Sequence, residues 1–196
     1  ADAVSTITSY YNPQKLLSGA FYEGARLGEI WGYTTEGLFE SDGQAQDPSH
    51  DQSYLSPELW RAGDINYSDI NGDGKIDVGT NTVNDPGDKS IIGNSTPRFT
   101  FSGVFSTYWK GFDLNMLWQG VAKRDLALDG SLFWGIIGNK WWNIGLQEHM
   151  DYWTEENTDA YWARPYFEKW ERKNQQTQTR FIQNGAYLRM KSLQIG

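Results

Sequence analysis

The sequence contains no cysteine and only two histidines, His50 and His149, in 196 residues. Without cysteine there can be no disulfide bond and no thiolate metal site. The spaced motifs of zinc proteases, serine hydrolases and phosphate-binding loops are also missing. Glu155 and Glu156 are adjacent in sequence, so their carboxylates diverge and do not form the opposed pair of a glycosidase. We therefore expect a protein that is not an enzyme.

Long apolar runs and an excess of basic residues are missing too. No stretch approaches the ~18 apolar residues that define a membrane-spanning helix. The net charge is -8, with 25 acidic against 17 basic side chains, and this disfavours nucleic acid as a partner because a phosphate backbone requires a basic surface. Mean hydropathy is only -0.65, although aromatic residues make up 15% of the chain. Strands that alternate polar and apolar residues produce such an average.

The most regular pattern lies between residues 98 and 122, where large apolar side chains alternate with smaller or polar ones. A two-residue turn at Lys110 and Gly111 would make this stretch a hairpin whose strands share one apolar face. That face is sustained for about 10 residues, the length at which a tilted strand crosses a bilayer in a β-barrel. Its residues are Phe99, Phe101, Gly103, Phe105, Thr107, Trp109, Phe112, Leu114, Met116, Trp118, Gly120 and Ala122.

The fold class we expect is all-β, with antiparallel strands that form part of a transmembrane β-barrel. Extended segments are predicted near residues 24–39, 98–109, 112–126 and 179–196, and the last of them runs to the end of the sequence, as in a piece of a longer polypeptide. The connections at about 40–97 and 128–178 are long, with short helical turns expected at 56–62 and 147–154. Long extracellular loops opposite short periplasmic turns are typical of outer-membrane barrels.

Strict alternation in the last segment predicts one face that is charged first and apolar later. Charges near the loop and apolar residues further along suit a strand that enters the lipid, because a charge at mid-bilayer costs roughly 2 to 4 kcal/mol. Four strands cannot close a barrel, so we expect further strands of the same protein beside them. The residues predicted on this face are Tyr187, Arg189, Lys191, Leu193 and Ile195.

Residues 69–77 match the first nine positions of an EF-hand calcium loop. Oxygen ligands at positions one, three, five and nine, the carbonyl at seven and the glycine at six all fit, with Ile76 as the apolar anchor. Position twelve is Thr80, so a later carboxylate, Asp85 or Asp88, must supply the last ligand. We expect a structural calcium ion in a connection that carries eleven carboxylates between residues 40 and 88. The predicted ligands are Asp69, Asn71, Asp73, Lys75, Asp77 and Asp88.

Six tryptophans in the second connection allow two interpretations. Their faces can stack on sugar rings, or they can fill a loop core and an interfacial aromatic belt, and for any single tryptophan the structural role is favoured. The alternative function is therefore a secreted, calcium-stabilised, carbohydrate-binding β-sandwich, in which the apolar face of the hairpin is buried. A third interpretation, a dockerin-like interaction module, fits only the calcium loop and requires a second such loop, which the sequence does not contain. These tryptophans are Trp134, Trp141, Trp142, Trp153, Trp162 and Trp170.

Several phrases, in order along nearly the whole chain, resemble the C-terminal part of SusC/RagA-type TonB-dependent outer-membrane transporters. They lie at residues 28–33, 36–39, 63–65, 69–77, 85–88, 91–98, 110–114, 119–120, 153–160 and 187–193. Each phrase is weak alone, and the set is specific. The resemblance also implies that Asp88 closes the calcium loop.

The resemblance implies a plugged barrel of about 22 strands in the bacterial outer membrane. Such a transporter imports glycans or peptides, works with a SusD-like surface lipoprotein as a lid, and is energised by TonB. The plug and the TonB box of the family are not in this sequence, so coupling cannot be assigned to any residue here. Which substrate is carried is not encoded in these features.

Overall fold

The computed structural model describes residues 5–18, 21–47, 50–135, 145–166 and 173–196, and within them every strand pair is antiparallel. The all-β antiparallel fold class is therefore confirmed. No helix in the described ranges is long and apolar enough to span a membrane. The elements in chain order are β1 (Glu29–Tyr33), β2 (Thr35–Leu38), α1 (Asp42–Ala45), β3 (Ile65–Tyr67), β4 (Lys89–Asn94), β5 (Phe99–Trp109), β6 (Phe112–Ala122), β7 (Asp125–Ala127), α2 (Ser131–Trp134), η1 (Gln147–Met150), η2 (Thr179–Phe181), β8 (Ile182–Asn184) and β9 (Tyr187–Ile195).

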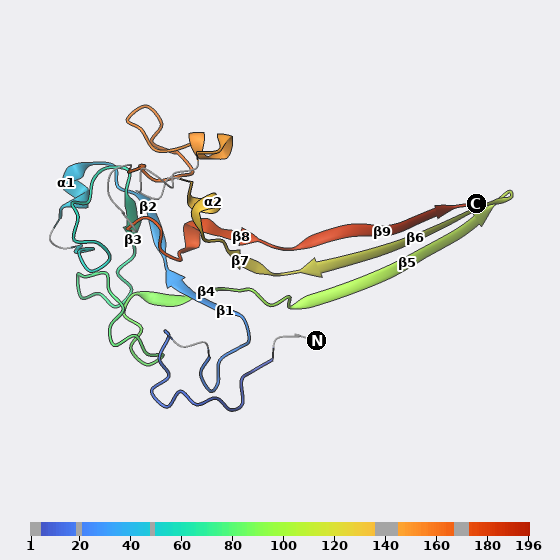
Figure 1. Ribbon diagram of the computed structural model, residues 1–196, viewed down its shortest axis with the longest axis horizontal. Coiled ribbons are helices and arrows are strands. Elements are labelled where there is room, and N and C mark those ends of the chain that lie inside the picture. Colours follow the sequence, from blue (N-terminus) through green and yellow to red (C-terminus); the bar gives the residue numbers. More distant parts are fainter. Residues whose placement is uncertain (1–4, 19–20, 48–49, 136–144, 167–172) are drawn as a thin grey trace.

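A long ribbon of β5, β6 and β9 extends away from the rest of the protein (Figure 1). The hairpin register is the one predicted, from Phe99 opposite Ala122 to Trp109 opposite Phe112. Lys110 and Gly111 at the turn have φ angles of 50° and 94°. A two-residue hairpin turn with positive φ at both positions follows the right-handed strand twist, and glycine adopts such angles without strain.

Within the described residues no second sheet covers the ribbon. Every residue of β5 is exposed, and Phe99, Phe101 and Phe105 leave 45%, 49% and 51% of their surface open. Leu114, Met116 and Trp118 of β6 are half-buried because β6 is the central strand, between β5 and β9, while Phe112 beside the turn is exposed. The β-sandwich alternative required burial of these side chains against a second sheet, and for the described part of the chain that alternative is wrong.

Strand β9 corrects the predicted alternation of the last segment. Met190 pairs with Trp118 and Ser192 with Leu117, so Lys191 is an extra residue at a β-bulge. The bulge reverses which residues share a face. Tyr187 and Arg189 therefore lie on the polar face, while Leu193 and Ile195 join the apolar one. The apolar face of β9 consists of Leu188, Met190, Leu193 and Ile195, opposite Gly120, Trp118, Met116 and Leu114.

The three ribbon strands β5, β6 and β9 are each separated from a neighbouring strand, β4, β7 or β8, by a short break, and the three breaks lie side by side. Between β4 and β5 lie residues 95–98, between β6 and β7 lie 123–124, and between β8 and β9 lie 185–186. Hydrogen bonds join the breaks to one another: the Arg98 N–H donates to the Lys123 carbonyl, and the Gly185 N–H donates to the Arg124 carbonyl. This level separates the ribbon from the part of the molecule that contains the core.

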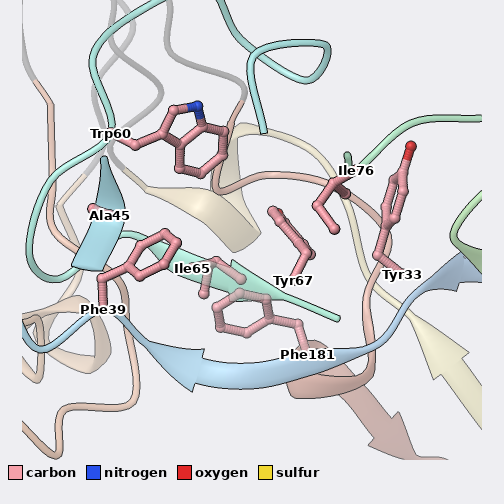
Figure 2. Close-up of a cluster of buried hydrophobic side chains, with 8 residues drawn as sticks. All are labelled: Tyr33, Phe39, Ala45, Trp60, Ile65, Tyr67, Ile76 and Phe181. Carbon is pink, nitrogen blue, oxygen red and sulfur yellow. The ribbon is translucent and has the colours of Figure 1, made fainter. Parts of the chain in front are cut away.

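The core lies where the two long connections meet. Side chains from β1, β3, the first connection and η2 gather in one cluster (Figure 2). The first connection is thus not a plain loop, since it contains α1, β3 and β4. A helical turn is confirmed at 147–150 as η1, whereas the turn predicted at 56–62 is wrong, because that stretch has no helix. The cluster consists of Tyr33, Phe39, Ala45, Trp60, Ile65, Tyr67, Ile76 and Phe181.

A buried ion pair fixes the second connection to the first. The Lys173 Nζ atom lies 2.7 Å from Asp64 Oδ2, and these side chains are 1% and 0% exposed. Lys173 also donates to the Leu59 carbonyl, and Asn174 and Tyr166 donate to Asp64. Burial, followed by the Asp64 charge, raises the pKa of the Tyr166 hydroxyl well above its ordinary value, so this group stays a donor. Both charges are paired and hydrogen-bonded, as buried charges must be.

Candidate functional site

The segment that matches the calcium loop is held by hydrogen bonds from its own backbone. Asp69 accepts from the N–H groups of Gly72 and Gly74 at 2.7 and 2.8 Å. Asn71 Oδ1 accepts from the Asp73 N–H, and Asp73 Oδ1 accepts from the Lys75 N–H. Each side chain at positions one, three and five thus folds back onto the turn that follows it.

The glycine and the isoleucine of the motif have the predicted roles. Gly74, at position six, has a φ of 82°, which is the left-handed conformation that the sharp turn requires. Ile76 is fully buried in the core cluster. The Asp51 and Lys75 backbones form a parallel bridge beside it. The loop is therefore anchored to the core at its C-terminal half.

Asp88, rather than Asp85, is the late carboxylate that returns to the loop. Its side chain is completely buried, and its two oxygens accept from the N–H groups of Ile70 and Asp77, each at 2.8 Å. Burial raises the pKa of Asp88, against the lowering effect of these N–H donors. Asp88 therefore ties the beginning of the motif to its end, although it lies 18 residues after Ile70 in the sequence.

Asp77 and Asp85 belong to the neighbouring turn. Asp77 Oδ1 accepts from the Gly79 N–H at 2.6 Å, and Asp85 Oδ2 accepts from the Thr80 N–H at 2.9 Å. The Thr80 hydrogen bonds lower the pKa of Asp85. Asp77 contacts Asp88 through its backbone: its N–H donates to Asp88 Oδ2, and its carbonyl accepts from the Asp88 N–H.

The predicted ligands are close in the chain without forming a ready-made cage. In the described ranges no three His, Asp or Glu side chains converge as they would around a metal ion. The donor set still fits calcium in kind: carboxylate, amide and carbonyl oxygens are its preferred ligands. Each carboxylate oxygen bonded to one N–H keeps a second lone pair for a cation. The segment thus carries donors of the kind that calcium takes, on turns stabilised by its own N–H groups.

The tryptophans that can be placed have packing roles. Trp162 stacks on Phe181 with ring centroids 5.2 Å apart, and Trp134 meets the same ring edge-on at 5.0 Å. The cavity beside them holds only about 50 Å³, too small for a sugar ring. Trp153 lies under Arg164. Trp141, Trp142 and Trp170 lie outside the described residues.

Two groups of residues with evident roles had no signal in the sequence. Lys173 and Asp64 are separated by more than one hundred positions, and only the packed connections bring them together. The hollow that Arg26 and Glu29 line together with Arg98, Lys123 and Asp125 likewise draws on distant segments. A buried lysine has no distinctive neighbours in sequence, so only a three-dimensional structure reveals it.

The geometry defines a class of protein: antiparallel and loop-rich, with an apolar ribbon that no second sheet covers in the described residues. No family model matches the sequence. Among curated proteins, the chain is similar to TonB-dependent receptor P3 of Formosa agariphila, with 24% identity over 174 residues. The match covers 89% of this chain and 15% of the receptor, so the chain spans a small part of that relative's length.

Proposed function

We propose that the chain is a segment of the β-barrel wall of a TonB-dependent importer in the bacterial outer membrane. The observation that carries this proposal is the β5–β6–β9 ribbon, whose aromatic and aliphatic face has no protein over it in the described residues. Exposed apolar surface of this extent is unfavourable in water and favourable in hydrocarbon. The likeness to a TonB-dependent receptor supports the same assignment.

In this proposal the ribbon spans the bilayer. The strand breaks at 95–98, 123–124 and 185–186, at the end of the ribbon opposite the Lys110–Gly111 turn, mark the outer surface of the membrane. The connections 40–97 and 128–178 then lie outside the cell, and the Lys110–Gly111 turn lies in the periplasm. Further strands of the same protein pair with the open edges of β5 and β9, because unpaired backbone groups are not tolerated in lipid. The Lys191 bulge supports the arrangement, since it places Arg189 on the polar face.

The imported substrate is a glycan or a peptide, and the lid is a SusD-like lipoprotein. TonB supplies the energy through the plug and the TonB box of the transporter, which are not among these residues. Deleting the gene should abolish growth on one class of polymer. Deleting a neighbouring lipoprotein gene should have the same effect. Unchanged growth on both polymer classes after the gene deletion would contradict the importer role.

Single cysteines test which face meets lipid, and this chain offers a cysteine-free background. In the full-length protein in membranes, a cysteine that replaces Phe105 should react with an apolar maleimide and should not react with a charged one. A cysteine at Val104, the adjacent residue on the opposite face, should react with the charged reagent if the barrel interior is wet. Equal reactivity of the two positions with the charged reagent would rule out lipid contact.

We propose in addition that calcium binds the 69–88 segment and has a structural role. The supporting observations are the Asx-type turns at Asp69, Asn71 and Asp73 and the return of Asp88 to the motif. Bound calcium would offset clustered negative charge in a connection whose acidic side chains outnumber its basic ones. Asp69, Asn71, Asp73, the Lys75 carbonyl and Asp88 are the ligands, with Asp77 at position nine.

Calcium removal is expected to loosen this connection and leave the hairpin unchanged. Treating the wild-type protein with a chelator should speed proteolysis between residues 64 and 92 by about tenfold or more, because opening of the loop no longer requires loss of the ion. The Asp73→Ala variant should be cleaved quickly with or without chelator. Asp85→Ala is the matched control and should keep the chelator response. Identical cleavage of the wild type in both conditions would argue against a bound ion.

A further inference from the structure

Asparagine followed by glycine occurs twice in the chain, at Asn71–Gly72 and Asn184–Gly185. Both asparagines are exposed, and each Oδ1 atom accepts from the N–H two residues later, at 3.0 Å for Asn71 and 2.9 Å for Asn184. This turn folds the side-chain amide back toward the glycine that follows, whose nitrogen no side chain shields. Attack of that nitrogen on the amide carbon is the first step of asparagine deamidation, so both pairs are candidates for this modification.

The surroundings of the two glycines differ. The Gly72 N–H donates to the Asp69 carboxylate at 2.7 Å, whereas the Gly185 N–H donates to the Arg124 carbonyl at 2.7 Å. A carboxylate can take a proton near neutral pH, and a peptide carbonyl cannot. The space where a Cβ atom of Gly72 would lie is open within 4 Å, while at Gly185 the Leu126 side chain lies 3.0 Å away. Gly72 therefore has a base beside its nitrogen and room for its backbone to rotate.

The Asn71 amide is polarised for the same reaction. The Asp73 N–H donates to its oxygen, and its Nδ2 group donates to Asp73 Oδ2 at 3.1 Å. A donor at the oxygen stabilises the negative charge that develops there when a nucleophile attacks the carbon. Asn71 thus has a donor at its carbonyl in addition to the base at the attacking nitrogen.

We propose that Asn71 is a site of spontaneous deamidation, for which the chain itself supplies the nucleophile and the base. Asp69 takes the proton of the Gly72 N–H, the Gly72 nitrogen bonds to Asn71 Cγ, and the Cγ–Nδ2 bond breaks. The proton passes through solvent to the departing nitrogen, which leaves as ammonia. Water then opens the cyclic imide at either of its carbonyls and leaves aspartate or isoaspartate at residue 71. The reaction consumes only water.

The modification changes a ligand of the calcium site that we propose. Aspartate at residue 71 replaces an amide oxygen by a carboxylate, and the number of charged ligands tunes calcium affinity. Isoaspartate adds one carbon to the backbone and moves the side chain out of its turn. The deamidation itself does not depend on bound calcium, since its nucleophile and base belong to the chain.

Peptide mass spectrometry of the full-length protein tests the site. The folded protein is kept in mildly alkaline buffer with chelator, and deamidation of the peptides that contain Asn71 and Asn184 is followed over time. Asn71 should react about tenfold or more faster than Asn184, because a positioned base accelerates proton transfer by ~10²-fold or more. In urea the two rates should converge, because both pairs then differ only in sequence context. Equal rates in the folded protein, or a slower rate at Asn71, would overturn the proposal.

A variant of the base tests the mechanism. Asp69→Asn keeps an oxygen acceptor and removes the base, so deamidation at Asn71 should slow by about tenfold or more. The rate at Asn184 in the same sample should stay the same and shows that the fold is kept. Asp85→Asn alters a carboxylate that accepts from the Thr80 N–H in the neighbouring turn, and this matched control should leave both rates unchanged. An Asn71 rate unaffected by Asp69→Asn would contradict the proposed reaction.

Added calcium separates this proposal from the calcium site. An ion bound by Asp69 and Asn71 would occupy the base and hold the amide in place, so calcium should slow deamidation of the wild-type protein. If Asn71 reacts faster than Asn184 with chelator and calcium does not change the rate, the calcium site is contradicted and the deamidation site is supported. If Asn71 reacts no faster than Asn184 with chelator, the deamidation site is wrong, whatever calcium does.

Discussion

Replacing Lys173 by alanine is expected to destabilise the packed connections by about 3–5 kcal/mol, because Asp64 would remain buried without its partner. Lys173 also lies over the rings of Trp60 and Tyr166, at 5.2 and 4.2 Å from their centroids, so packing is lost as well. Hydrogen exchange at the Ile65 and Gln178 amides should accelerate by about two orders of magnitude or more, since ~1.4 kcal/mol is a factor of ten.

The effect should be specific to the unpaired charge. Arg61→Ala removes an exposed side chain of the same connection and should change exchange at these amides by less than about twofold. Asp64→Asn combined with Lys173→Met removes both charges and should cost less than the sum of the single changes. If Lys173→Ala left exchange at Ile65 unaltered, the ion pair would not join the two connections.

Placing arginine at Phe105 is expected to cost about 2–4 kcal/mol of folding free energy in a bilayer, because this residue lies near the middle of β5 on the apolar face. Val104 is the neighbour on the other face and is also exposed, at 72%. Val104→Arg should therefore cost little. Refolding titrations in urea with lipid vesicles measure both variants. Equal costs at the two positions would show that the faces do not differ in their contact with lipid.

Local pattern accounts for the parts of the fold that the sequence predicted well. The alternation of residues 99–122 and the two-residue turn specify the hairpin, because side chains in a strand alternate strictly and a glycine can take positive φ. The motif at 69–77 predicted its own turns for the same reason, since each Asp or Asn there bonds to a nearby N–H. Whether calcium fills it remains a prediction.

The register of β9 and the pairing of distant segments were beyond sequence reasoning. The alternation of residues 187–195 gave the wrong faces, since a single extra residue at Lys191 reverses every side chain after it, and only pairing with β6 locates that residue. The choice between Asp85 and Asp88 depended on the return of the chain to Ile70, although the resemblance had implied it.

The sequence by itself determined an antiparallel hairpin with one apolar face, an acidic connection and a calcium-type loop, because each depends on residues near one another in the chain. Only the tertiary structure decided that no second sheet covers the hairpin in the part of the chain that it describes, and that Lys173 is buried beside Asp64. Those facts depend on which distant segments meet. Contacts of this kind follow from packing the whole chain, and no local pattern encodes them.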